Sequence, residues 1–156
     1  PEAQMDMVRL GIGLHGVAAT ANEQRQLQMV ATLKTTISQI KHVKAGETIG
    51  YSRKGVAKQD MTIATVGIGY ADGFNRHLGS EVGKMLVMGQ FAPVVGSVCM
   101  DMTMIDITGI PAREGTEVIV FGNEYSILEI AKQLDTIPYE VLTGISSRVK
   151  RVYFQE

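Results

Sequence analysis

The chain has 156 residues, with 15 Lys and Arg against 16 Asp and Glu, a formal net charge of −1 and one cysteine. This length fits one ordinary domain whose core needs neither disulfides nor metals, and the balanced charge lacks the basic excess of nucleic-acid or anionic-membrane binders. Because apolar runs are short and no leader pattern opens the chain, we expect a soluble, cytoplasmic protein.

The first half of the chain alternates short β-rich runs with glycine turns. Residues 7–13 are expected to form a strand that runs into a glycine turn. Residues 27–43 carry apolar side chains at period two, which favours a strand, although three of them would also fit one face of a helix. Further β-rich runs lie at residues 48–51 and 61–66.

The second half adds more strands and one helix. Gly89-Gln90 suits a two-residue hairpin turn with glycine in its first position. Ser126 is expected to cap a helix, with Glu129 completing a capping box. The apolar face of this helix comprises Ile127, Ile130, Ala131 and Leu134, and strands are predicted at residues 84–88, 91–98, 102–107, 117–121 and 148–154. Many short strands and one late helix predict an all-β, barrel-like fold.

A glycine-rich turn near the start is the first candidate for chemistry. Gly11-Ile12-Gly13-Leu14-His15-Gly16 matches the spacing of dinucleotide-binding turns. No βαβ unit or acidic partner follows it, so the dinucleotide interpretation is disfavoured. A plain tight turn explains the glycines, and the backbone N–H groups of such a turn can also hold a phosphate.

The other reactive side chains suggest packing or solvation. His15, His42 and His77 lack cysteine or carboxylate neighbours at ligand spacing, so no metal site is predicted. Cys99 is expected to be a buried, inert thiol. The basic stretch holds one aromatic residue, Tyr51, and is expected to be a solvated face rather than a nucleic-acid platform. This stretch comprises Lys41, Lys44, Arg53, Lys54 and Lys58.

Six short motifs follow one another along nearly the whole chain. They are Arg9-Leu10-Gly11-Ile12, Gly50-Tyr51-Ser52-Arg53, Ile68-Gly69-Tyr70-Ala71-Asp72-Gly73, Val98-Cys99-Met100-Asp101, Tyr139-Glu140-Val141-Leu142-Thr143 and Ile145-Ser146-Ser147-Arg148-Val149. Together and in this order they resemble the C-terminal part of alanine racemase. The resemblance implies a β-barrel-like C-terminal domain at residues 27–156. It also implies that residues 1–26 end a (β/α)₈ barrel that binds pyridoxal 5'-phosphate (PLP). The family lysine that carries PLP is absent from this sequence.

The resemblance assigns four residues to PLP. It places Arg9 against the pyridine nitrogen and directs the N–H groups of Gly11 and Ile12 to the phosphate. Tyr139 offers its hydroxyl to the same phosphate. An arginine that stays charged is a poor proton donor, so it leaves the pyridine nitrogen unprotonated and moderates the ring as an electron sink.

Three further residues are implied to act in the neighbouring subunit of a homodimer. Tyr51 matches the tyrosine that handles the α-proton on one face of the substrate carbon. Tyr70 and Met100 match substrate-binding residues that enter the partner's site, and Met100 directs its backbone N–H toward the substrate carboxylate. The ordinary pKa of a phenol is about 10, so nearby positive charge or hydrogen bonds are needed for it to act as a base near neutral pH.

The implied function is the interconversion of L- and D-alanine for peptidoglycan synthesis. Because the chain begins at Pro1 without a methionine, we expect a piece of a longer enzyme that is inactive alone. A free-standing barrel used for binding or scaffolding is the alternative. Ser97 stands where many relatives carry arginine near the substrate entrance, and His15 replaces a frequent tyrosine. A parent fused behind a cell-wall Mur ligase also fits the resemblance.

Overall fold

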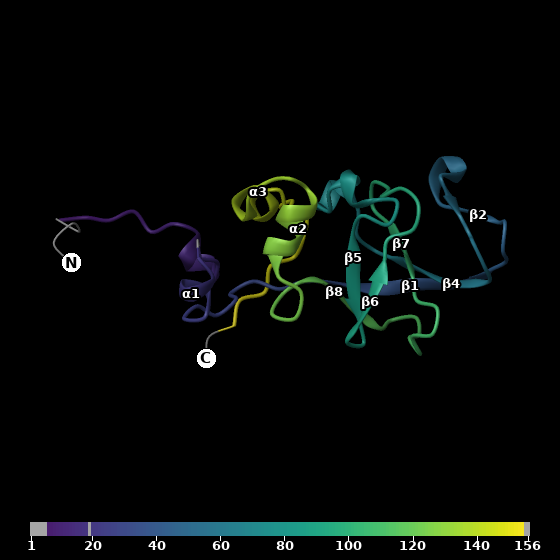
Figure 1. Ribbon diagram of the computed structural model, residues 1–156, viewed down its shortest axis with the longest axis horizontal. Coiled ribbons are helices and arrows are strands. Elements are labelled where there is room, and N and C mark those ends of the chain that lie inside the picture. Colours follow the sequence, from purple (N-terminus) through teal and green to yellow (C-terminus); the bar gives the residue numbers. More distant parts are fainter. Residues whose placement is uncertain (1–5, 19, 155–156) are drawn as a thin grey trace.

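A nearly closed antiparallel sheet forms the body of the molecule (Figure 1). The computed structural model describes residues 6–18 and 20–154. The sheet has the order β6-β5-β8-β1-β4-β7, and neighbouring strands run antiparallel. Its strands are β1 (Leu33–Val43), β4 (Met61–Val66), β5 (Lys84–Val87), β6 (Gln90–Pro93), β7 (Thr103–Asp106) and β8 (Glu117–Phe121).

A bridge beyond β6 joins the two edges of this sheet. Val94 pairs with Ile105 of β7, and the Val95 N–H donates to the Met104 carbonyl at 2.8 Å. This contact satisfies backbone groups that an open edge would leave unpaired. The predicted all-β, barrel-like fold is confirmed.

The long strand β1 lies inside the sheet, and its two halves pair with different strands. Its first half pairs with β8 and its second half with β4. The strand begins at Leu33, whose partner Phe121 is the last residue of β8. Residues 27–32 were expected to continue the strand, but they lie beyond the end of β8 and stay outside the sheet.

The hairpin between β5 and β6 is confirmed, with its turn one residue earlier than predicted. Val87 pairs with Gln90, so Met88 and Gly89 form the two-residue loop. Their φ angles are 50° and 76°. Two positive φ values define the turn whose twist matches that of flanking strands, and glycine occupies the second position instead of the first.

Two predicted terminal strands, at residues 7–13 and 148–154, are wrong. Residues 6–11 pair with no strand among the residues that the structure describes, and they lead into a 3₁₀ helix, η2 (Ile12–His15). Near the other end, the Arg151 guanidinium donates to the carbonyls of Ile145, Ser146 and Val149. A β-rich run alone does not make a strand, because each strand needs a partner for its backbone groups.

The predicted helix is α2 (Ile127–Gln133), which buries Ile127, Ile130 and Ala131. Ser126 caps it by accepting from the Leu128 N–H at 3.2 Å, so the expected capping box with Glu129 is wrong. A second late helix, α3 (Pro138–Thr143), was not predicted, although Pro138 opens it in a position that favours helix starts. The short helix α1 (Ala21–Gln24) lies near the N-terminal arm (Figure 1).

The barrel has one main core and a smaller, separate cluster. The smaller cluster supports the two-stranded sheet formed by β2 (Thr48–Ile49) and β3 (Gly55–Val56). Its buried members are Ile49, Ala57, Ile63 and Val95. The hairpin that carries Tyr51 therefore has a hydrophobic anchor of its own. Within residues 6–18 and 20–154, no helix has the length and apolar character needed to cross a bilayer.

Two expectations about side chains can be compared with this fold. The basic stretch is exposed throughout, as predicted, in Lys41, Lys44, Arg53, Lys54 and Lys58. Cys99 is partly buried rather than buried and lies in the loop after β6, with its Sγ 3.7 Å from the Ser97 carbonyl oxygen.

Candidate functional site

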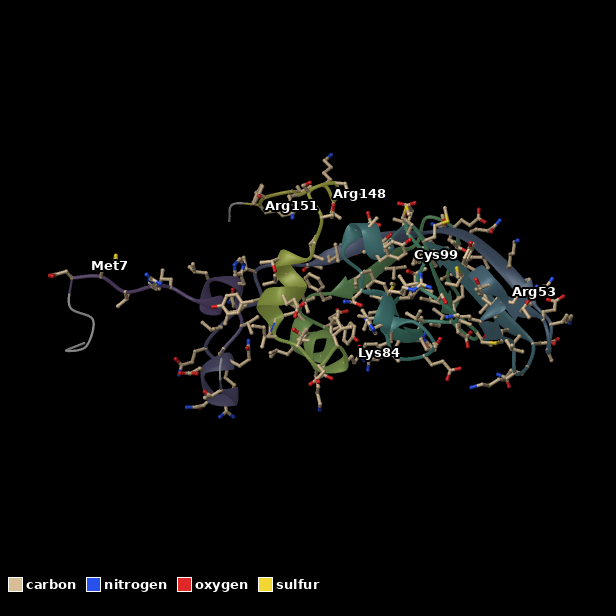
Figure 2. All side chains as sticks on the ribbon, turned by 90° about the horizontal axis from the view of Figure 1, so that it is seen from above. Met7, Arg53, Lys84, Cys99, Arg148 and Arg151 are labelled. Carbon is tan, nitrogen blue, oxygen red and sulfur yellow. The ribbon has the colours of Figure 1, made fainter. Side chains whose placement is uncertain are left out.

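The residues singled out by the motifs are spread along the molecule. Figure 2 shows Met7 on the N-terminal arm at one end and Arg53 at the opposite end. Arg9 and Gly11 follow Met7 along the arm, whereas Tyr51 lies on the same hairpin as Arg53. One chain therefore does not gather all predicted site residues around one point.

Gly11 and Tyr139 meet at the end that carries the arm. A Cβ at Gly11 would lie 2.8 Å from the Tyr139 hydroxyl oxygen. Gly11 caps η2, and the first N–H groups of a helix have no partner within it. Tyr139 follows Pro138 in the first turn of α3. Backbone N–H groups and a phenolic O–H are hydrogen-bond donors, so this donor set fits a phosphate group.

The two other residues that the resemblance assigns to PLP, Arg9 and Ile12, lie close to Gly11 in the sequence. The Arg9 side chain is exposed on the extended arm, and Ile12 is partly buried where η2 begins. His15, at the end of η2, is exposed. The arm thus presents one guanidinium and the start of a 3₁₀ turn beside α3.

Tyr51 lies at the tip of the β2–β3 hairpin, and 74% of its surface is exposed. Gly50, Ser52 and Arg53 have φ angles of 77°, 60° and 56°. The left-handed conformation is costly for residues other than glycine, by about 1–3 kcal/mol each, and such strain concentrates at functional sites. The tip thus holds an exposed phenol in a strained turn.

The hairpin rests against the segment that leads to Met100. A Cβ at Gly50 would lie 2.6 Å from Met104 Cε, and a Cβ at Gly55 would lie 3.2 Å from the backbone of Gly96. Ser97 is buried in this segment. The hairpin that carries Tyr51 therefore packs on β7 at Met104 and against the backbone of Gly96.

Tyr70 and Met100 are brought together by backbone hydrogen bonds between two loops. Tyr70 begins a 3₁₀ helix, η4 (Tyr70–Asp72), and its N–H donates to the Cys99 carbonyl at 3.0 Å. The Ala71 N–H donates to the Met100 carbonyl at 3.0 Å. A Cβ at Gly69 would lie 2.3 Å from the Met100 oxygen, so only glycine allows this approach. Within the described part of the chain, the Met100 N–H donates to no protein acceptor.

Arg148 joins these two loops, a role that the motifs did not assign to it. Its Nε lies 2.8 Å from Asp72 Oδ1, and its Nη2 pairs with Asp101 Oδ1. The hydrogen bond to Asp101 raises the pKa of Arg148, which stays charged. All three residues lie in the quoted motifs, but their contact depends on the fold.

A cavity of about 460 Å³ opens beside η4. Its wall combines Tyr70 and Phe74 with residues of α2 and α3, including Ile130, Glu140 and Val141. The sequence held no signal for this cavity, because its walls come from segments far apart in the chain.

Comparison with known proteins places these features in a family. Residues 30–153 match the family model described as alanine racemase, C-terminal domain. An alanine racemase of Desulfosudis oleivorans is 44% identical, over 98% of this chain and 41% of its own length. Alanine racemase 2 of Caldanaerobacter subterraneus subsp. tengcongensis is 45% identical, over 97% of this chain and 40% of its own.

Solved structures of alanine racemases share the fold of this chain. Alanine racemase from D-cycloserine-producing Streptomyces lavendulae superposes with a TM-score of 0.91 at 31% identity, covering 99% of this chain and 42% of its own. The Bartonella henselae enzyme, solved with covalently bound pyridoxal phosphate, gives 0.88 at 31% identity, covering 96% of this chain and 42% of its own.

This chain spans about two fifths of the length of the curated relatives it matches. The likeness extends over nearly the whole chain in both sequence and structure. The chain belongs to the alanine racemase C-terminal domain family.

Proposed function

We propose that this chain is the C-terminal part of a PLP-dependent alanine racemase that interconverts L- and D-alanine for peptidoglycan synthesis in the cytoplasm. Residues 27–156 form the β-domain, and residues 1–26 end the preceding (β/α)₈ barrel. The observation that carries the proposal is the contact of Gly11 with the Tyr139 hydroxyl, because two motifs from opposite ends of the chain meet there with donors suited to a phosphate.

The residues beside that contact would hold PLP. Gly11 and Ile12 would donate backbone N–H groups to the phosphate, and Tyr139 would donate its hydroxyl. Arg9 would face the pyridine nitrogen and, because it stays charged, would leave that nitrogen unprotonated. When bound, PLP supplies an electron sink that makes the α-proton of alanine acidic.

Tyr51 would move the α-proton on one face of the substrate carbon. Its phenolate would take the proton from L-alanine, and its hydroxyl would return one in the reverse direction. A phenol does this near neutral pH only when its pKa is lowered by positive charge or hydrogen bonds. The exposure of Tyr51 in the isolated chain leaves room for a partner subunit to supply such groups.

The separation of the site residues supports a homodimer. Gly11 meets Tyr139 on the arm that carries Met7, whereas Tyr51 lies on the hairpin that carries Arg53, and Figure 2 shows Met7 and Arg53 at opposite ends. If both sets serve one reaction, the Tyr51 hairpin must act on the cofactor of another subunit, and we assign the loops carrying Tyr70 and Met100 to that same partner site. Each protomer would then complete its partner's site.

Racemisation by the enzyme that contains this chain tests the proposal. The full coding sequence should yield a protein that binds PLP and converts L-alanine to D-alanine, followed with a D-amino-acid oxidase assay. The reverse reaction should reach the same equilibrium ratio of one, since the two enantiomers have equal energy. A protein that binds PLP at no defined lysine and leaves alanine unchanged would favour a binding or scaffolding module.

A further inference from the structure

Arg148 stands where three segments of the chain converge. Its Nε pairs with Asp72 on η4, and its Nη2 pairs with Asp101 in the loop after Met100. Arg148 itself follows α3 in the turn near residues 146–149. In Figure 2 it lies on the outer face of the molecule, apart from the hairpin marked by Arg53.

Asp72 is the centre of this arrangement. Its Oδ1 faces Arg148, and its Oδ2 accepts from the Gly69 N–H at 2.8 Å. Its backbone carbonyl accepts from the Ser146 N–H at 3.1 Å. Only 12% of the Asp72 side chain is exposed, so its charge is compensated within the protein.

The turns on either side fit closely around these bonds. A Cβ at Gly73 would lie 2.4 Å from the Gly144 carbonyl oxygen, and Gly73 has a φ of 105°. The η4 turn and the turn after α3 therefore interlock through backbone as well as through Asp72. Asp101 is more exposed and reaches this unit through Arg148.

The pairing differs from the lysine ion pairs on the surface. Lys34 with Glu117 joins two exposed side chains on neighbouring strands, a kind of pair that contributes little to stability. Arg148 uses two nitrogens of one planar group to join carboxylates from two loops. Such a fork restricts relative orientation in a way that a lysine ammonium does not.

The two loops are those that present the predicted substrate-binding residues. Asp101 directly follows Met100, whose N–H lacks a protein acceptor among the described residues, and Asp72 lies two residues after Tyr70. We propose that Arg148 is a positioning residue that holds the Met100 N–H and Tyr70 in register toward the substrate carboxylate. This role rests on the racemase function proposed above.

The effect should fall on substrate binding more than on proton transfer. The Tyr51 hairpin has its own cluster of Ile49, Ala57, Ile63 and Val95, and no described contact of Arg148 reaches it. Loss of the fork should raise KM because the carboxylate partner shifts, whereas the phenol that moves the proton stays in place.

The test uses the complete two-domain enzyme with Arg148→Ala, Arg148→Lys and Asp101→Asn, and Lys34→Ala as the surface ion-pair control. Arg148→Ala should raise KM for L-alanine by about 10- to 100-fold, because a small misplacement of a positioning group can cost this much. We expect kcat within about threefold of wild type and unchanged PLP content. Arg148→Lys should recover only part of the lost substrate affinity, because lysine keeps the positive charge but lacks the planar fork that joins both carboxylates.

A double-variant cycle strengthens the test. If Arg148 acts through Asp101, adding Asp101→Asn to Arg148→Ala should raise KM little further. An unchanged KM with a lowered Tm would make Arg148 a purely structural residue and overturn the proposal. Equal losses of kcat and PLP would also overturn it, because they indicate general disruption. A wild-type enzyme that does not racemise alanine would instead overturn the proposed function, and with it this role.

Discussion

The backbone of Gly11 and the hydroxyl of Tyr139 are in such close contact that a Cβ at Gly11 would lie 2.8 Å from the hydroxyl oxygen. Gly11 belongs to the N-terminal arm and Tyr139 to α3. The φ of Gly11 is −97°, so the close approach to the Tyr139 hydroxyl, rather than a left-handed backbone, is the reason for glycine here.

Gly11→Ala should therefore weaken PLP binding in the two-domain enzyme without destabilising the fold. The added methyl would displace the Tyr139 hydroxyl, and loss of one hydrogen bond to a charged phosphate corresponds to about 10- to 100-fold in affinity. A fluorescence titration of apoenzyme with PLP measures this change.

Gly13→Ala is the matched control for Gly11→Ala, because its Cβ would meet only Leu27 Cδ1 at 4.0 Å. It should leave PLP affinity unchanged. In a Tyr139→Phe background, Gly11→Ala should cost less than in wild type. Equal PLP affinity of wild type and Gly11→Ala would remove Gly11 from the phosphate site.

Tyr51→Phe should abolish most activity while leaving stability nearly unchanged. The ring is exposed at the hairpin tip and the substitution removes only a hydroxyl, so Tm should move little. Loss of a positioned acid–base group lowers the rate by about 10²- to 10⁴-fold. Solvent deuterium exchange should collapse for the α-proton of L-alanine and persist for D-alanine.

Tyr153→Phe makes the same chemical change on another exposed tyrosine and should leave both exchange rates as in wild type. If Tyr51→Phe also exchanges both enantiomers at the wild-type rate, Tyr51 does not move the proton.

Gly96→Ala should destabilise the chain more than Gly109→Ala. Both glycines have positive φ, at 68° and 81°, so each substitution strains the backbone. Only at Gly96 would the new Cβ also press on the hairpin, 3.0 Å from the Ile49 carbonyl oxygen, whereas nothing lies within 4 Å at Gly109. Overpacking of this kind adds about 1–3 kcal/mol.

Denaturant unfolding of both glycine variants measures that difference. In the complete enzyme, Gly96→Ala should also reduce activity, because the hairpin carrying Tyr51 must shift. Equal losses of stability in the two variants would show that the hairpin yields freely at Gly96.

The chain by itself should form no specific covalent bond with PLP. The lysine and motif that carry PLP in the family are absent from its sequence. Incubation with PLP, borohydride reduction and peptide mass spectrometry should find low, scattered modification of surface lysines and no racemase activity. Stoichiometric labelling of one defined lysine would contradict this expectation.

Local sequence patterns predicted a strand correctly where the partner strand is also rich in β-branched and apolar residues. Residues 61–66 and 117–121 are strands, as their content of β-branched and apolar residues predicted, and both pair with β1, where apolar residues recur at period two. The hairpin at Met88-Gly89 was predicted with its turn misplaced by one residue, since glycine suits either turn position.

Tertiary structure decided the elements whose pattern had no partner. Residues 7–13 and 148–154 were predicted as strands, yet no strand in the described part of the chain pairs with them, and they stay outside the sheet. The short helix α3 was missed because six residues are too few to establish a helical period.

The sequence alone identified the family motifs and hence Tyr51, Tyr70, Met100 and the arm residues as candidates. Only the fold brought Gly11 to Tyr139 and joined Asp72 and Asp101 through Arg148. Residues distant in the chain meet according to strand register and loop closure, and neither is encoded in the spacing of a short motif.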